Sequence, residues 1–191
     1  PIGTQPLLEI QIRNLVKQGF DEIFVATNYK SEYIENFIGD GTKLGARITY
    51  SREEKPLGTC GPLSLIREKL NEPFILMNGD ILCAMNFGAL FEFGEKQNSL
   101  FTVGTKNIRT PFNFGSVEVV GDTIISVEEK PDFVIEIVAG IYFIKPALLD
   151  QVPDETYFGI DELIRNMVGG GQTVSRYLIE EYWLDIGRID D

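Results

Sequence analysis

Helical and extended patterns alternate along the first eighty residues of this chain, and this alternation restricts the fold more than any other feature. Residues 6–20 carry apolar side chains at positions 7, 8, 12, 15 and 16, close to helical spacing, and Gly19 can end the helix. Short β-branched and aromatic runs follow at helix-sized intervals. We therefore expect strands at 21–29, 46–54 and 73–80, and helices at 31–41 and 61–70.

The second half of the chain keeps this alternation and adds a hairpin. Residues 115–131 form two alternating runs around a turn at Gly121 and Asp122. Such a pattern predicts an α/β fold with a mainly parallel sheet covered by helices and an antiparallel hairpin insert. The remaining expected elements are helices at 87–98 and 158–170, strands at 99–106 and 137–146, and one or two strands within 173–187.

Length and hydropathy favour one globular domain. The 191 residues, 43% of them hydrophobic, suffice for one sizeable core, so we expect a single domain over residues 1–191. No apolar run approaches the length of a membrane span, and no signal-peptide pattern opens the sequence. We therefore expect a cytoplasmic protein that does not bind membranes.

The residue inventory excludes several kinds of chemistry. The chain has no histidine, which rules out Ser-His-Asp triads, Cys-His pairs and histidine-bearing zinc sites. Cys60 and Cys83 lack metal-binding spacing and are expected to be small, reduced core residues. A formal charge of -12 argues against nucleic acid as a partner, because that binding needs an excess of Lys and Arg. Carboxylates, lysines, backbone amides and an added metal remain available.

Four short polar motifs lie at predicted strand ends or in loops. Asp80 leaves an apolar strand, and ligands of open α/β sheets bind beyond the carboxyl ends of the strands. Each motif alone also has an ordinary structural interpretation, as a turn, a solvated charge pair or a glycine-rich loop. Together they suit the binding of a divalent cation and phosphate groups. The motifs are REEKPLGTCGPL (52–63), NGD (78–80), EEKP (128–131) and YWLDIG (182–187).

Six segments, in order along nearly the whole chain, resemble those of the sugar-phosphate nucleotidyltransferases. They are PLLEIQIRNLVKQGF, IENFIGDGTKLGARITYSREEKPLGTCGPL, PFILMNGDIL, IISVEEKP, AGIYFIKP and YWLDIGRIDD. The resemblance implies a Rossmann-like three-layer sandwich. It also implies an enzyme that joins a nucleoside triphosphate to a sugar 1-phosphate, releasing pyrophosphate and forming a nucleotide sugar. REEKPLGT and EYWLDIGR are most similar to the mannose-1-phosphate guanylyltransferase-like branch, whose members serve polysaccharide synthesis.

The resemblance implies roles for three charged residues. Asp80 and Asp185 match the two carboxylates that hold Mg²⁺ beside the α-phosphate, and Lys130 matches the lysine that contacts the sugar phosphate. This set agrees with the absence of histidine. The attacking phosphate oxygen is already anionic, so the reaction needs positioning and charge stabilisation but no general base.

Four further positions match substrate contacts of the family. Glu129 matches a carboxylate that binds sugar hydroxyls, and Gly140 matches a glycine whose backbone approaches the sugar. Gly58 matches a nucleobase contact, and Glu53 falls where members place a side chain against the base edge. A carboxylate only accepts hydrogen bonds, and guanine offers adjacent N1-H and N2-H donors, which favours GTP. For Glu53, a charged strand end facing water remains an open alternative.

The sequence departs from the family pattern in three places. Family members open with a strand and a glycine-rich loop that binds the triphosphate, and we expect both to be absent from residues 1–191. Val138 and Gly159 stand where many members have asparagine and aspartate, which leaves the sugar undetermined. A second hypothesis therefore stays open, that of a non-catalytic nucleotide-sugar-binding or regulatory subunit with the same fold. Association into a homo-oligomer is a further expectation, because a missing strand would expose apolar sheet edges.

Overall fold

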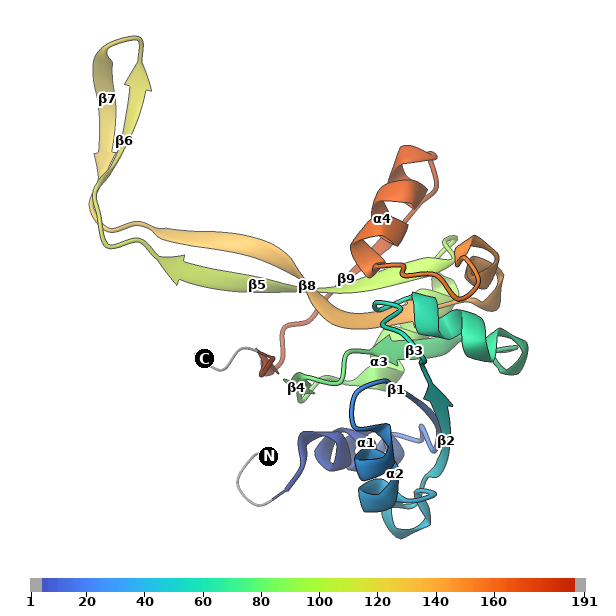
Figure 1. The fold of residues 1–191 in the computed structure, drawn as a ribbon. Helices are drawn as coiled ribbons and strands as arrows, with labels where there is room; N and C mark the ends of the chain where they lie inside the picture. The colour runs from blue at the N-terminus through green and yellow to red at the C-terminus, as the bar shows by residue number, and fades with distance from the viewer. Residues whose placement is uncertain (1–4, 188–191) are drawn as a thin grey trace.

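The structure, a computed structural model, describes residues 5–187 and shows a body of sheets and helices from which a long arm projects (Figure 1). Its N-terminal part contains two parallel strands, which pair from Glu22↔Arg47 to Thr27↔Arg52. Helices and strands bury a small core of Ile12, Ile38 and Ile48. The elements are α1 (Leu7–Lys17), β1 (Glu22–Thr27), α2 (Ser31–Ile38), a 3-10 turn η1 (Thr42–Leu44) and β2 (Arg47–Arg52).

The main sheet of the body has four strands in the order β3-β8-β5-β9. β5 and β9 are parallel, whereas β8 runs antiparallel to both β3 and β5. This direction follows from the hairpin between β5 and β8, which returns the chain beside the strand it has just left. The α/β fold class predicted from the alternation is confirmed. The strands are β3 (Phe74–Met77), β5 (Phe101–Pro111), β8 (Asp132–Ile144) and β9 (Ser175–Leu178).

Strand β8 shows why the body has three layers. Its successive side chains point to opposite faces of the sheet. Ile141 and Phe143 enter a core with helix α3 (Phe87–Lys96), while Tyr142 and Ile144 enter a second core with helix α4 (Ile160–Gly169). The packing against α3 is close, since a Cβ added at Gly94 of that helix would collide with the Phe143 ring.

One predicted helix has a different type in the structure. The segment expected as a helix at 61–70 is a 3-10 helix, η2 (Gly61–Lys69), with the Ser64 hydroxyl donating to the carbonyl of Gly61 at 2.7 Å. A further 3-10 helix, η3 (Pro146–Gln151), follows β8. The region 173–187 contains two strands, β9 and the short β10 (Trp183–Asp185), and β10 pairs antiparallel with β4 (Ile81–Cys83).

The arm consists of residues 106–137 and leads away from the body (Figure 1). Its stem is the outer part of β5 and β8, which stay paired out to Pro111↔Asp132. Its tip is the predicted hairpin, made by β6 (Ser116–Val120) and β7 (Thr123–Glu128) around Gly121 at a φ of 58°. Within residues 5–187, no helix is both long enough and apolar enough to cross a membrane.

Candidate active site

The structure brings Asp80 and Asp185 together. Asp80 follows β3, and Asp185 ends β10, whose register places it opposite Ile81. The amide of Ile186 donates to the carbonyl of Asp80 at 2.9 Å, which fixes the two chain segments side by side. A Cβ added at Gly187 would lie 2.6 Å from Oδ2 of Asp80 and 3.1 Å from Oδ1 of Asp185. The two carboxylates therefore border one small space, kept open by the glycine.

The donor atoms in this space fit a divalent cation. Oδ1 of Asp80 is buried and has no hydrogen-bond partner among residues 5–187, which is costly unless a further group completes the site. Oδ1 of Asp185 accepts from the amide of Gly187 at 2.8 Å, which orients that carboxylate. Mg²⁺ in phosphate-transfer sites commonly uses one or two protein carboxylates, with water and phosphate supplying the other ligands. Among the described residues no cluster of three or more Asp, Glu, Cys or His side chains offers an alternative metal site.

Gly140 lies against the same turn. Its φ of 70° is in the left-handed region that favours glycine. Its carbonyl accepts from the amide of Asn78 at 2.9 Å, and an added Cβ would lie 3.0 Å from Nδ2 of Asn78. Gly140 therefore lets β8 approach the Asn78 to Asp80 turn, which is an independent structural reason for a glycine at a predicted sugar-binding position.

Gln11, on helix α1, supports the turn from the interior. Its side chain is 6% exposed, and Nε2 donates to the carbonyl of Ile81 at 2.6 Å and to that of Asn78 at 3.2 Å. These two carbonyls flank Asp80 in the chain. Gln11 is not among the residues predicted from the sequence, because a glutamine in a helix is ordinarily assigned to the solvated face. The only available signal was its place between Leu8 and Leu15, on or near the apolar stripe.

Glu53 and Gly58 belong to the loop after β2, and both have structural roles there. Oε2 of Glu53 accepts from the amide of Leu57 at 2.8 Å, closing the loop on itself. Gly58 has a φ of 76°, and an added Cβ would lie 2.9 Å from the carbonyl oxygen of Phe158. Within the described part of the chain, Oε1 of Glu53 accepts no hydrogen bond. Base recognition by this loop remains a prediction.

Glu129 and Lys130 lie where the hairpin joins the stem, and the structure does not bring them to the two aspartates. Lys130 is exposed, with a φ of 51°. Strand β8 runs from Asp132 to Gly140, and at about 3.3 Å per residue this segment spans roughly 26 Å. A lysine side chain cannot cover that distance. The predicted roles of Glu129 and Lys130 in sugar-phosphate binding therefore remain predictions.

The other predicted groups have the expected surroundings. Cys60 and Cys83 are free and buried, and burial raises the pKa of both thiols, that of Cys60 to about 12. Both are therefore core residues rather than nucleophiles.

A surface hollow of about 450 Å³ is lined in part by Gln18, Met85 and Glu181 and includes none of the predicted site residues.

The fold of the described body is similar to that of solved structures. The crystal structure of HddC from Yersinia pseudotuberculosis superposes with a TM-score of 0.76 over 100% of this chain and 84% of that chain, at 21% identity. The structure of HddC complexed with GMP-PN gives a TM-score of 0.73 with the same coverage and identity. The chain therefore shares the α/β fold of these solved structures.

The sequence model of the family described as "Nucleotidyl transferase" matches residues 1–191. The chain belongs to this family. It is 34% identical over 191 residues to the mannose-1-phosphate guanylyltransferase catalytic subunit beta of Dictyostelium discoideum, covering 95% of this chain and 52% of the relative. It is 32% identical over 197 residues to the mannose-1-phosphate guanyltransferase of Yarrowia lipolytica, covering 99% and 54%. The chain thus spans about half the length of these relatives.

Proposed function

We propose that residues 1–191 form a single catalytic domain that transfers a nucleotidyl group from a nucleoside triphosphate to a sugar 1-phosphate. The observation that carries this proposal is the pair of Asp80 and Asp185 around one space in a chain of the nucleotidyl transferase family. Within residues 5–187, the buried Oδ1 of Asp80 has no hydrogen-bond partner. The non-catalytic alternative is not favoured, because no observation beyond the sequence departures supports it and the Dictyostelium relative is named as a catalytic subunit.

In the proposed reaction, an oxygen of the sugar phosphate forms a bond to the α-phosphorus. The bond from that phosphorus to the bridging oxygen of the β-phosphate breaks, and pyrophosphate leaves with the electron pair. Asp80 and Asp185 would hold Mg²⁺, which when bound supplies stabilisation of the charge on the α-phosphate. Gln11 keeps the Asp80 turn in place through its two backbone contacts. Lys130 would neutralise the sugar phosphate when the arm bends over the body.

We propose GTP as the nucleotide. The relatives from Dictyostelium and Yarrowia are named for guanylyl transfer to mannose 1-phosphate, and the solved HddC complex contains GMP-PN. Oε1 of Glu53 could accept from N1-H or N2-H of guanine while Oε2 keeps its bond to Leu57. Gly58 and Gly140 would let the backbone approach the base and the sugar. A cytoplasmic location fits the two free cysteines, and association into a homo-oligomer fits the exposed apolar arm.

The proposal is tested by pyrophosphate release from the full-length protein with MgCl₂, each nucleoside triphosphate and a panel of sugar 1-phosphates. We expect release to be fastest with GTP, and Asp80→Asn and Asp185→Asn to lower the rate about 100-fold or more. Asp122→Asn, the same change in the exposed hairpin turn, is the matched control and should keep full activity. No release with any substrate pair, or an active Asp80→Asn, would refute the proposal.

A further inference from the structure

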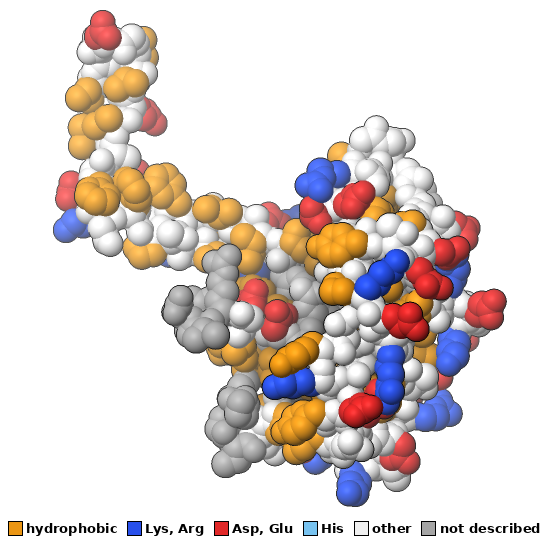
Figure 2. All heavy atoms as spheres, in the orientation of Figure 1, with side chains coloured by type: hydrophobic (Ala, Val, Ile, Leu, Met, Phe, Trp, Pro, Cys, Tyr) orange, Lys and Arg blue, Asp and Glu red, His pale blue; other side chains and the backbone are white. Residues whose placement is uncertain are grey.

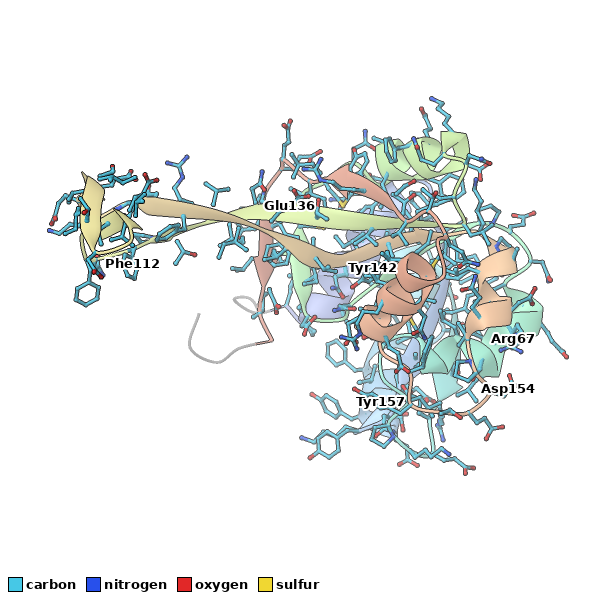
Figure 3. The ribbon with its side chains drawn as sticks, turned by 90° about the horizontal axis from the view of Figure 1, so that it is seen from above. Arg67, Phe112, Glu136, Tyr142, Asp154 and Tyr157 are labelled. Carbon is cyan, nitrogen blue, oxygen red and sulfur yellow. The ribbon has the colours of Figure 1, made fainter. Side chains whose placement is uncertain are left out.

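Tyr157 is an exposed aromatic residue beside the loop that follows β2. It lies in the segment between η3 and α4, and its side chain is 66% exposed. A Cβ added at Gly58 would lie 3.3 Å from Cε2 of Tyr157, so the ring rests against the glycine turn. Figure 3 shows Tyr157 on the body, well away from the outer end of the arm, where Phe112 lies.

The residue after Tyr157 is hydrogen-bonded to the same loop. The amide of Phe158 donates to the carbonyl of Leu57 at 2.9 Å, and its carbonyl accepts from the amide of Cys60 at 3.0 Å. The Phe158 side chain is buried in the core beneath the loop. The main chain at Tyr157 therefore has a defined position relative to the glycine turn.

The residues before Tyr157 are held by the 3-10 helix η2. Arg67 of η2 forms an ion pair with Asp154 at 2.9 Å, and the Ser64 hydroxyl accepts from the amide of Glu155 at 3.2 Å. The main chain is thus held on both sides of Tyr157. An exposed ring on a fixed main chain loses little conformational freedom when it binds a ligand, which favours binding.

A hydrogen-bond acceptor lies next to this ring. Oε2 of Glu53 accepts from the amide of Leu57, and the Tyr157 ring contacts Gly58, the following residue. One short turn therefore carries a carboxylate on one residue and an aromatic ring on the next. A planar ligand with N–H donors on its edge, such as guanine, needs these two kinds of group, one for its edge and one for its face.

The Gly58 loop also lies near the Asp80 turn. Burial raises the pKa of Tyr142 on β8, and the nearby Cys60 and Asp80 raise it further. Cys60 belongs to the Gly58 loop and Asp80 to the carboxylate pair, so one buried side chain lies near both. Each of the two loops follows the carboxyl end of a strand, where ligands of α/β sheets bind.

The charge of the chain favours a contact that does not depend on charge. The 29 Asp and Glu residues exceed the 17 Lys and Arg residues, and the resulting field repels an anionic nucleotide. Figure 2 shows acidic side chains spread over the visible face of the body. Stacking of a base on an aromatic ring is available to every base and needs no cation.

We propose that the ring of Tyr157 stacks on the base of the bound nucleotide while Glu53 accepts from the edge of that base. This inference rests on the proposed nucleotidyl transfer, because it takes the Gly58 loop as the base site. It assigns Tyr157 to nucleotide binding and gives it no part in the chemical step.

The first test measures GMP binding to the full-length protein by calorimetric titration. Tyr157→Ala should raise the GMP dissociation constant about tenfold or more, because the base loses its stacking partner. Tyr157→Phe keeps the ring and should stay within about twofold of the unchanged protein. Phe114→Ala removes a ring of similar exposure, 71%, from the arm and should change nothing. Ribose 5-phosphate, which lacks a base, should bind equally to the unchanged protein and to Tyr157→Ala.

The second test uses the kinetics of pyrophosphate release. Tyr157→Ala should raise KM for GTP and leave kcat and KM for the sugar 1-phosphate within about twofold, because stacking holds the base equally before and during the reaction. Its Tm should match that of the unchanged protein.

The outcomes separate this inference from the proposed function. If the unchanged protein releases pyrophosphate, then an unaltered GMP dissociation constant in Tyr157→Ala, or equal losses in Tyr157→Ala and Tyr157→Phe, would overturn the stacking alone. An effect on KM for the sugar 1-phosphate only would do the same. Absence of both GMP binding and pyrophosphate release in the unchanged protein would overturn the stacking and the proposed transfer together.

Discussion

The side-chain amide of Gln11 on the first helix donates to the main-chain carbonyl of Ile81 at 2.6 Å, immediately beyond Asp80. A second bond from the same nitrogen reaches Asn78 at 3.2 Å. A buried side chain thus holds both ends of the turn that presents the Asp80 carboxylate. The geometry of the carboxylate pair depends on a helix that contributes no ligand to it.

Replacing Gln11 should therefore affect both stability and metal binding. Gln11→Ala removes the side-chain donor from the buried carbonyl of Ile81 and from the partly buried carbonyl of Asn78. We expect a loss of about 1–3 kcal/mol in the free energy of unfolding. The affinity for Mg²⁺ should also fall, because the Asp80 turn is no longer fixed. Urea denaturation and calorimetric titration with MgCl₂ measure the two effects. Gln172→Ala, at an exposed loop position, should change neither, and an unchanged Mg²⁺ affinity in Gln11→Ala would contradict the positioning role.

Neutralising Asp80 should separate metal binding from folding. Among the described residues its Oδ1 has no hydrogen-bond partner, and Asp185 borders the same space, so Asp80→Asn removes one of two neighbouring carboxylates without breaking a bond of Oδ1. Without metal, we expect its Tm to equal or exceed that of the unchanged protein. Added MgCl₂ should raise the Tm of the unchanged protein only. Thermal unfolding with and without EDTA measures this, and equal Mg²⁺ stabilisation of both proteins would count against the site.

Filling the space beside the carboxylates should also abolish Mg²⁺ binding, here by steric exclusion of the cation. The Cβ of Gly187→Ala would lie 2.6 Å from Oδ2 of Asp80, in the region that a cation would use. We expect loss of Mg²⁺ binding with the fold preserved. Gly79→Ala is a close control, because nothing lies within 4 Å of its added Cβ in the neighbouring turn. Calorimetric titration of both variants with Mg²⁺ measures this. Loss of binding in Gly187→Ala alone supports a cation site in this space, whereas equal loss in both variants would indicate a general effect of replacing a glycine.

The buried thiol of Cys60 should make stability depend on pH at the alkaline end. Burial raises its pKa from 9.0 to about 12, so the folded state retains a proton that the unfolded state loses. This contribution is complete below pH 9 and is lost as the pH rises toward 12. Cys60→Ala should show a smaller decrease in the free energy of unfolding between pH 9 and pH 11, measured by urea denaturation. Equal slopes for the two proteins would show that another group dominates.

The fold class could be predicted from the spacing of apolar residues. The pairing of Asp80 with Asp185 could be predicted only from the family resemblance. Alternating periodicity identified most helices and strands, because apolar spacing directly reflects burial. Asp80 and Asp185 were matched by resemblance, and only the antiparallel pairing of β4 with β10 explains why they meet. Gln11 was not predictable, because burial of a polar side chain depends on which carbonyls the fold brings near. The direction of the arm was not predictable either. Residue periodicity indicates that a hairpin forms, but it does not specify how the hairpin is oriented relative to the body.

Strand β10 has only three residues, yet it carries half of the carboxylate pair. It pairs with β4. In addition, the amide of Ile186 donates to the carbonyl of Asp80, and the indole N–H of Trp183 donates to the carbonyl of Ala139 at 2.8 Å. So short a strand should open locally far more often than the body unfolds. A cation bound by both Asp80 and Asp185 would stabilise the pairing of β10 and make its local opening rarer. The hydrogen-exchange rate of the Ile186 amide would then report occupancy of the site in a protein that is otherwise unchanged.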